Sequence, residues 1–326
     1  MLRHGAGHGK GASGAPARYH PSPSAGAEMK PHDPPYLAPH PGFAPMPGEG
    51  ALPRIALVAA DGARAELYLH GAHVTSWRPA DDTADGPDRL FVSARSRFET
   101  GVPIRGGVPV SFPQFASQGP LPAHGFARVT PWLPVAAERM PAGAARAVLR
   151  LVDSDATRSL WPHPFAAELT VTVAGRRLEV NLAVSNTGKS AFAFTGALHT
   201  YLRMSDVRAV SVHGLQHARY RDKALGADDV LETAPGLRID REIDRAYYAA
   251  PGDLEVRSPD RTTSVRATGF PDTVVWNPGA IRGATLDDLE PGGYLRMLCV
   301  EAAIARSPVE LAPGARWEGA QTLTAR

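Results

Sequence analysis

The sequence predicts an all-β protein, a large antiparallel β-sandwich with few, short helices. From Leu52 onward the dominant spacing of apolar residues is two, which is typical of strands. Stretches with the helical period of 3.6 are scarce, and Gly, Pro, Asp and Asn separate the short apolar runs. Many short strands without intervening helices favour an antiparallel sandwich or barrel over a parallel α/β sheet.

Two hairpins are predicted from alternating apolar residues. The first joins 55–57 to 65–69 around Asp61-Gly62, which is a turn sequence. The second joins 169–173 to 178–184 across Ala174-Gly175. Further strands are expected at 147–152, 191–198, 264–267, 273–276 and 294–300, whereas 222–231 is expected to be at most a short helix.

Residues 1–50 are expected to form a disordered Pro/Gly/His-rich tail, and residues 51–326 one large domain. The first 50 residues hold ten of the 31 Pro, nine of the 32 Gly and five of the 12 His, with almost no periodic apolar residues. Such a segment buries too little surface to offset its ordering entropy. It lacks the apolar stretch of a secretory signal. Its acid-poor start leaves a transit peptide open, although no Arg-rich amphipathic helix can form there.

Composition argues against several classes of partner. With 35 Lys and Arg against 33 Asp and Glu, the formal charge of +2 argues against nucleic acid. No apolar run reaches the roughly 18 to 20 residues that span a bilayer, so no membrane partner is expected. The single Cys299 excludes a disulfide framework and a multi-cysteine metal site, and it makes the cytoplasm the default location.

Several chemistry-bearing residues lie beside the predicted strands. The glycines after Arg105 let the backbone approach a ligand closely, and the nearby His124 and Arg128 can donate to a sugar hydroxyl and fork onto a phosphate. His199 ends an apolar strand and can serve as a general acid in a cleft. Glu301 lies in a strongly apolar run, where a carboxylate either pairs structurally or has a raised pKa suited to a base. A structural role remains the alternative for each.

Other catalytic motifs are missing. Thr187-Gly188-Lys189-Ser190 ends like a phosphate-binding loop, but the first glycine of that motif is replaced by Ala183, and a hairpin turn is expected instead. Neither a G-x-S-x-G elbow nor an H-E-x-x-H site occurs. Serine-hydrolase and zinc-protease chemistry are therefore disfavoured.

Taken in order, seven stretches resemble the hexose-6-phosphate mutarotase (glucose-6-phosphate 1-epimerase) family, a branch of the aldose 1-epimerases. They run through nearly all of residues 52–326. They are "GAHVTSW" (71–77), "RGGVPVSFPQF" (105–115), "PAHGFARVTPW" (122–132), "HTYLR" (199–203), "DTVVWNPG" (272–279), "CVE" (299–301) and "LAPG" (311–314).

The resemblance implies a galactose-mutarotase-like β-sandwich with its site on the concave face of one sheet, and no metal or organic cofactor. It implies His199 as general acid and Glu301 as general base. One departure is Ala123, where the family often has Gln, so that phosphate dependence and sugar preference stay open. The positions matching those that bind the sugar phosphate are Arg105, Arg128 and Asp244, with His124 beside them.

The expected reaction is interconversion of the α and β anomers of a hexose 6-phosphate, glucose 6-phosphate in particular, by ring opening and reclosure. Glu301 would take the proton of the C1 hydroxyl while imidazolium His199 protonates the ring oxygen, which predicts a bell-shaped pH dependence. The expected partner is a small sugar phosphate, and the expected state is a monomer or weak homo-oligomer. Alternatives are an epimerase of unphosphorylated sugars, a non-catalytic carbohydrate-binding module, and an unrelated β-sandwich with structural His and Glu.

Overall fold

The computed structural model of the chain describes residues 44–81, 87–250 and 252–326. The tail expected over residues 1–50 thus lies, up to residue 43, outside the described residues. Residues from Met46 on already pack: strand β1 (Met46–Pro47) pairs with β2 (Pro53–Val58), and the backbone N–H of Glu49 donates to the Tyr68 hydroxyl over 3.0 Å. The described packing therefore begins a few residues before the boundary that composition suggested.

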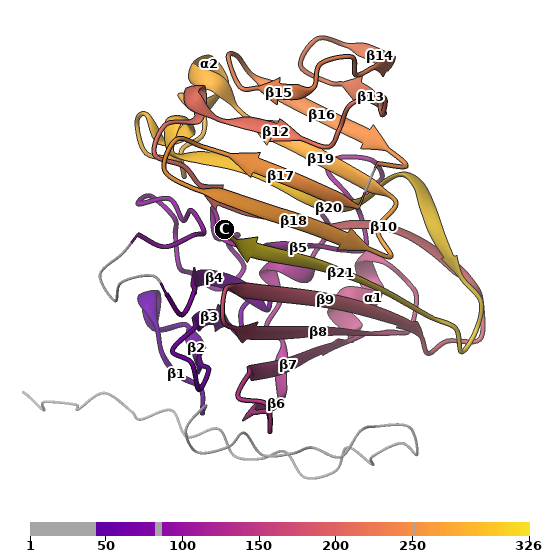
Figure 1. Cartoon of the computed structure of the whole chain (residues 1–326). Coiled ribbons are helices and arrows are strands. Elements are labelled where there is room, and N and C mark those ends of the chain that lie inside the picture. The colour runs from indigo at the N-terminus through magenta and orange to yellow at the C-terminus, as the bar shows by residue number, and fades with distance from the viewer. Residues whose placement is uncertain (1–43, 82–86, 251) are drawn as a thin grey trace, which may run out of the picture. The chain divides into compact units, whose positions relative to one another are not determined.

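Three antiparallel sheets make up the described chain, and the nine-stranded one lies in front in Figure 1. The smallest sheet has the order β1-β2-β3-β4, with β3 at Arg64–Tyr68 and β4 at His73–Arg78. The eight-stranded sheet consists in order of β14 (Ala227–Leu231), β13 (Arg219–Asp222), β16 (Ile243–Tyr248), β19 (Asp272–Asn277), β20 (Met297–Leu311), β10 (Phe192–Leu198) and β5 (Val110–Ser111), with β11 (Tyr201–Arg203) also paired to β20. The nine-stranded sheet consists of β15 (Gly236–Arg238), β12 (Ser211–His213), β17 (Asp253–Arg257), β18 (Thr262–Thr268), β21 (Arg316–Ala325), β9 (Arg177–Asn186), β8 (Phe165–Ala174), β7 (Ala145–Val152) and β6 (Leu133–Arg139).

Helices are short throughout the described residues. The α-helices are α1 (Asp155–Leu160) and α2 (Gly279–Gly283). Separate 3₁₀ turns lie at Glu49–Ala51, Ala127–Val129, Val207–Ala209 and Gly293–Arg296. None of the helices in the described ranges has the length and apolar character that crossing a bilayer requires. The predicted all-β class with few helices is confirmed.

The two large sheets bury a hydrophobic core between them, and the period of two decides which side chains enter it. Along β20, Val300, Ala302 and Ile304 join this core, whereas Glu301 and Ala305 face the other side of the sheet. Successive side chains of a strand point to opposite faces, so one strand serves both the core and an outer surface. The candidate site lies on that outer surface.

Both predicted hairpins are confirmed by the register of their strands. In the first, Ile55 lies opposite Leu67 on β2 and β3. In the second, Leu169 lies opposite Leu182 on β8 and β9. The turn expected at 187–190 connects β9 to β10, and the N–H of Gly188 donates to the Asn186 side chain over 2.9 Å.

The short helix expected at 222–231 is wrong, because this segment forms most of the β13–β14 hairpin. Tyr220 lies opposite Val230, and Gly226 turns the chain with a φ of 66°. The apolar residues at 224, 225, 227, 230 and 231 imitate a helical spacing. Strand β14 is the edge of its sheet and is largely exposed, so burial imposes no alternation on it.

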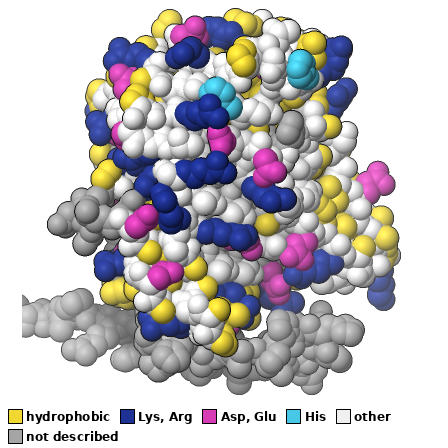
Figure 2. Space-filling view, in the orientation of Figure 1, with side chains coloured by type: hydrophobic (Ala, Val, Ile, Leu, Met, Phe, Trp, Pro, Cys, Tyr) yellow, Lys and Arg dark blue, Asp and Glu magenta, His cyan; other side chains and the backbone are white. Residues whose placement is uncertain are grey.

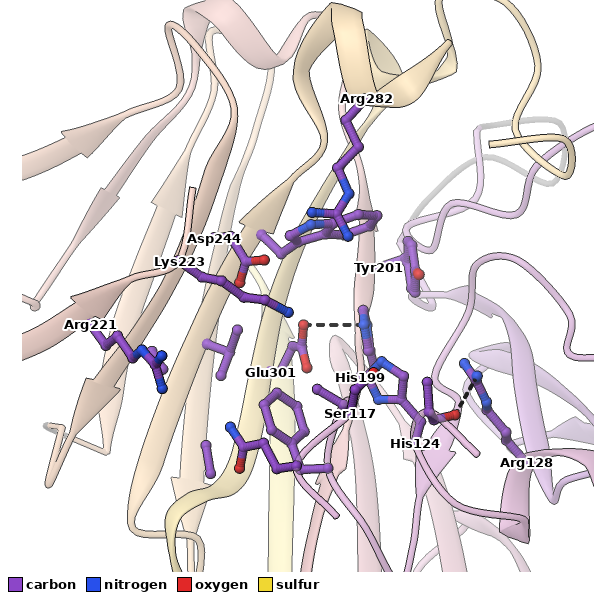
Figure 3. Close-up of a pocket in the computed structure, with 18 of the residues that line it drawn as sticks. Ser117, His124, Arg128, His199, Tyr201, Arg221, Lys223, Asp244, Arg282 and Glu301 are labelled. Carbon is purple, nitrogen blue, oxygen red and sulfur yellow. Dashed lines mark hydrogen bonds and ion pairs between the residues drawn. The ribbon is translucent and has the colours of Figure 1, made fainter. Parts of the chain in front are cut away.

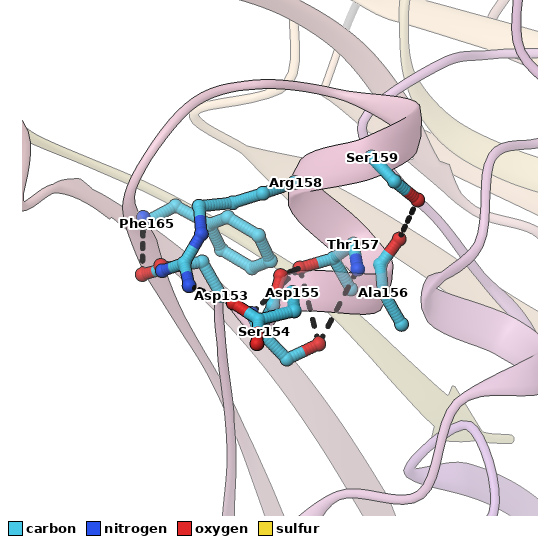
Figure 4. A network of polar contacts seen from close by, with 8 residues as sticks. All are labelled: Asp153, Ser154, Asp155, Ala156, Thr157, Arg158, Ser159 and Phe165. Carbon is cyan, nitrogen blue, oxygen red and sulfur yellow. Dashed lines mark hydrogen bonds and ion pairs between the residues drawn. The ribbon is translucent and has the colours of Figure 1, made fainter.

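Helix α1 shows how polar contacts fix a connection between strands β7 and β8 (Figure 4). The Thr157 N–H donates to Ser154 Oγ over 3.3 Å, and the Ser154 N–H donates to Thr157 Oγ1 over 2.8 Å, a reciprocal cap of the helix N-terminus. Arg158 pairs with Asp153 at 2.5 Å, and Asp153 also accepts from the Phe165 N–H at the start of β8. The helix is thereby tied to the strand that follows it.

Charges of both signs alternate on the outward face of the nine-stranded sheet. Figure 2 shows Lys and Arg side chains next to Asp and Glu across this face. Arg177 pairs with Glu179, and Glu255 pairs with both Arg257 (2.6 Å) and Arg326 (2.5 Å). The charges on this face are therefore mixed in sign rather than gathered by sign.

One buried polar link joins the two large sheets directly beneath the site. Gln321 of β21 accepts a hydrogen bond from the Thr200 hydroxyl and donates to the carbonyl of Val300 over 3.0 Å. All of these polar atoms would otherwise be buried without partners, which is costly. The link holds the segment between β10 and β11, and therefore His199, against the second sheet.

Candidate functional site

A cavity of about 560 Å³ lies on the face of the eight-stranded sheet that is turned away from the nine-stranded sheet. Strands β16 and β19 contribute every second side chain to it, and β20 contributes Glu301 and Ala305. Its lining residues are Arg105, Phe115, Ala116, Ser117, Gln118, Ala123, His124, Arg128, His199, Tyr201, Arg221, Lys223, Asp244, Ala246, Tyr248, Val274, Trp276, Arg282, Leu286, Glu301 and Ala305. All six site residues selected from the sequence are among them.

Small side chains make the hollow. Ala246 of β16 and Ala305 of β20 line the cavity, and Ala197 and Ala303 pack beside them. Alanine side chains project less far from the sheet than branched side chains, so space remains above them. The volume of the cavity suits a small ligand such as a monosaccharide.

His199 and Glu301 meet at the middle of this cavity (Figure 3). His199 follows β10, and Glu301 lies on the adjacent strand β20. Nε2 of His199 is 3.3 Å from Oε1 of Glu301, and the two residues are 8% and 1% exposed. Glu301 Oε2 and His199 Nδ1 are buried without hydrogen-bond partners among the described residues. A carboxylate oxygen left unpaired at the floor of a cavity is positioned to contact a ligand.

Aromatic contacts fix the orientation of the imidazole. The His199 ring stacks on Tyr201, with centroids 4.9 Å apart and planes 12° apart. The Trp276 ring lies nearly perpendicular to it, with centroids 6.0 Å apart. The backbone N–H of His199 donates to the Pro109 carbonyl over 3.0 Å, which fixes the main chain that carries the ring. The ring is therefore held in one position before any ligand arrives.

Burial works against charge on both members of the pair. It lowers the pKa of His199 well below its usual value, with His124, Arg128 and Arg105 adding to the effect. It raises the pKa of Glu301 well above its usual value, and the charge of Asp244 adds to this. These two shifts favour a neutral imidazole beside a protonated carboxyl rather than the charged pair expected from the sequence. Both arrangements carry one titratable proton, which is on the carboxyl in the neutral pair and on the imidazole in the charged pair.

Two arginines lie beside His199, on the side shown by Arg128 and Tyr201 in Figure 3. The Arg105 guanidinium donates from Nε to Asp288 over 3.0 Å and from Nη1 to the Tyr201 hydroxyl over 3.1 Å. Arg128 donates from Nη2 to the carbonyl of Ala123 over 2.8 Å. Arg105 is therefore compensated by a carboxylate, whereas the described hydrogen bond of Arg128 goes to a neutral acceptor.

The loop carrying Arg105 is supported from below by His73. Gly107 has a φ of 62°, and a Cβ there would lie 2.1 Å from the carbonyl oxygen of Val74. The ring of His73 fills the space under this loop, with Nε2 2.7 Å from the carbonyl oxygen of Gly106. Because a carbonyl only accepts, Nε2 carries the hydrogen. His73 thus positions the Arg105 loop without lining the cavity.

His73 also makes stability depend on pH. Burial lowers its pKa to about 3, with the Gly106 contact acting in the opposite direction. In the unfolded chain His73 is protonated below about pH 6.5, whereas in the folded chain it is protonated only below about pH 3. The contribution of neutral His73 to the free energy of unfolding is therefore full above pH 6.5 and is lost as the pH falls. His73→Gln keeps a donor for Gly106 but does not titrate.

We expect wild type to lose about 2 to 3 kcal/mol more unfolding free energy than His73→Gln between pH 7 and pH 4.5. Urea denaturation of both proteins at the two pH values measures this difference. Equal losses would show that His73 is not held neutral in the folded state.

His124 completes this side of the cavity. It has a φ of 67°, and its Nδ1 is 2.8 Å from Ser111 Oγ. The centroids of its ring and the His199 ring are 5.2 Å apart. Burial lowers its pKa to about 3, with Arg128 and Arg105 contributing, so this histidine is neutral at physiological pH. A neutral imidazole can exchange hydrogen bonds with sugar hydroxyls.

The opposite side of the cavity carries Asp244 and cations that the sequence analysis did not select. Burial raises the pKa of Asp244, while Lys223 and Arg282 oppose this. The backbone N–H of Lys223 donates to the backbone carbonyl of Asp244 over 2.8 Å. Figure 3 shows Lys223 and Arg221 across the pair from Arg128. Tyr201 and Trp276, which lie in the motifs at 199–203 and 272–279, also line the cavity, although the sequence predicted no role for them.

Comparison with known proteins places the chain in a family. A family model described as aldose 1-epimerase matches residues 53–324. The chain belongs to the aldose 1-epimerase family. The resemblance found in the sequence and the predicted isomerase class are thereby confirmed.

Relatives of this aldose 1-epimerase family member share most of its length. A protein of Cenchrus ciliaris called "Putative glucose-6-phosphate 1-epimerase" is 34% identical over 287 residues, which are 84% of this chain and 85% of that protein. A protein of Escherichia coli (strain K12) with the same name is 35% identical over 247 residues, 74% of this chain and 80% of that protein. The crystal structure of a "putative mutarotase" from Salmonella typhimurium has a TM-score of 0.79 at 30% identity, covering 88% of this chain and 94% of that one.

Proposed function

We propose that this protein interconverts the α and β anomers of hexose 6-phosphates, with glucose 6-phosphate as the substrate. The observation that carries the proposal is the His199–Glu301 pair, 3.3 Å apart in a sugar-sized cavity with Arg105 and Arg128 beside it. A binding module has no need of a buried acid–base pair. The names of the Cenchrus and Escherichia relatives support the same substrate class.

The reaction needs one group that takes a proton and one that gives a proton. Glu301 as carboxylate removes the proton of the C1 hydroxyl while His199 protonates the ring oxygen, and the bond from C1 to the ring oxygen breaks. The open aldehyde rotates about its C1–C2 bond. Reclosure from the other face returns both protons and gives the other anomer.

The proton count of the pair sets the pH dependence. The active pair holds one proton, which moves over 3.3 Å between Glu301 and His199. Adding a second proton removes the base, and taking away the single proton removes the acid. The rate is therefore expected to be bell-shaped in pH, with apparent pKa values that belong to the pair.

The arginines supply the preference for a phosphate. Charge-assisted bonds from guanidinium to phosphate are short and strong, and a neutral hexose offers nothing comparable. His124 and Asp244 are the proposed partners of the sugar hydroxyls. All of these groups come from one chain, so the proposal needs only a monomer or weak homo-oligomer, acting in the cytoplasm where the buried Cys299 stays a thiol.

Exchange NMR on a panel of hexoses with and without the 6-phosphate tests the proposal. We expect catalysed anomer exchange of glucose 6-phosphate with a kcat/KM at least about tenfold above that for glucose, because one charge-assisted bond contributes about 1.5 to 3 kcal/mol. Equal values would favour an epimerase of unphosphorylated sugars. Ligand-dependent thermal stabilisation without any exchange would favour a carbohydrate-binding module.

A further inference from the structure

A third potential ligand for a metal ion lies beside the acid–base pair. His199 Nε2, Cys299 Sγ and a carboxylate oxygen of Glu301 all lie within 4.8 Å of one another, and all three residues are buried. Cys299 and Glu301 are two residues apart on β20, so their side chains point to the same face. Cys299 does not line the cavity and has no part in the proposed reaction.

We propose that a borderline-soft divalent cation, with Zn²⁺ as the type ion, binds His199, Cys299 and Glu301 and inhibits the enzyme. Thiolate, imidazole and carboxylate are the ligands that Zn²⁺ takes in proteins. Metal–ligand bonds of about 2.0 to 2.3 Å place tetrahedral ligands about 3.3 to 3.7 Å apart. The 3.3 Å between Nε2 and Oε1 already meets this requirement.

The surroundings provide the rest of a three-ligand site. Binding releases one proton from the thiol and one from the Glu301 carboxyl, so that two negative charges neutralise the ion. Glu301 Oε2 is buried and has no hydrogen-bond partner among the described residues, which indicates that this oxygen contacts a bound group. His199 and Glu301 line the cavity, so the fourth coordination position opens towards it.

Inhibition follows from the overlap with the pair, and this half of the inference rests on the proposed function. An ion held by Nε2 and Oε1 occupies both atoms that carry the proton. The ion and the sugar therefore compete for one position. The positive charges of Arg105 and Arg128 near the site lower its affinity for a cation.

The experiment uses Co²⁺ as a spectroscopic probe and Zn²⁺ as the inhibitor, on the full chain. Cys299 is the single cysteine, so a cobalt–thiolate absorption band can come only from this site, whatever the five histidines of residues 1–50 bind. We expect the band in wild type and none in Cys299→Ser or Cys299→Ala. Circular dichroism verifies that the variants fold, and the Ser variant keeps the size of the side chain.

In the activity arm, Zn²⁺ is expected to inhibit wild type reversibly, with EDTA restoring exchange and Mg²⁺ having no effect. Loss of second-shell groups alone costs about 10- to 100-fold in metal affinity, so loss of Cys299 should raise the half-inhibiting Zn²⁺ concentration at least about tenfold. A wild type without the cobalt band overturns the site. A band with equal Zn²⁺ sensitivity in wild type and variant overturns the inhibition. A band in a protein that catalyses no exchange leaves the site standing and overturns the proposed function.

Discussion

Replacing Glu301 with Gln is expected to lower catalysed anomer exchange of glucose 6-phosphate by about 10²- to 10⁴-fold. The amide keeps the shape of the side chain but cannot accept the proton of the C1 hydroxyl. The loss is expected in kcat rather than KM, because proton transfer occurs in the transition state. Exchange NMR on the anomeric equilibrium measures both parameters.

A matched control lies on the same strand. Glu310 is exposed at the far end of β20, and Glu310→Gln is expected to exchange anomers at the wild-type rate. Burial raises the pKa of Glu301, so the folded protein is penalised when this carboxyl ionises at high pH. Glu301→Gln should therefore melt no lower than wild type above neutral pH. Near-normal exchange by Glu301→Gln would remove Glu301 from the base role.

The strands with one buried face were predictable from the sequence, and an edge strand was not. In β8 and β9, Leu169 and Leu182 face each other in the core, and burial imposes the alternation that the sequence shows. Strand β14 has no such constraint. Its apolar residues could be spaced as in a helix, and only Gly226 marked the turn.

That error also hid part of the site. Arg221 and Lys223 line the cavity because they lie two residues apart at the end of β13, where alternate side chains share a face. Read as part of a helix, the same lysine would be an ordinary solvated charge. The contact of Arg105 with Asp288 spans 183 residues, and no local pattern reports it. Tyr201, two residues after His199 on an extended segment, was the partner that alternation could have identified.

Arg128→Ala is expected to raise KM for glucose 6-phosphate by about ten- to a hundredfold, with a smaller effect on kcat. Hydrogen bonds to charged groups contribute about 1.5 to 3 kcal/mol, which corresponds to that range. Arg128 is chosen over Arg105 because Asp288 already compensates Arg105, so that removing Arg105 would also leave a carboxylate unpaired. The measurement is the concentration dependence of exchange at the pH optimum of each protein, for glucose 6-phosphate and for glucose. For glucose no change in kcat/KM is expected.

Two further observations separate a phosphate contact from a merely structural role of Arg128. Arg238 lies on β15 of the nine-stranded sheet. Arg238→Ala removes one positive charge there and is expected to leave KM unchanged. Arg128 is one of the charges that lower the pKa of His199, so its loss should move the pH profile of kcat towards higher pH. If KM rises equally for glucose and glucose 6-phosphate, Arg128 supports the loop around Ala123 rather than the phosphate, and the substrate assignment loses its main physical argument.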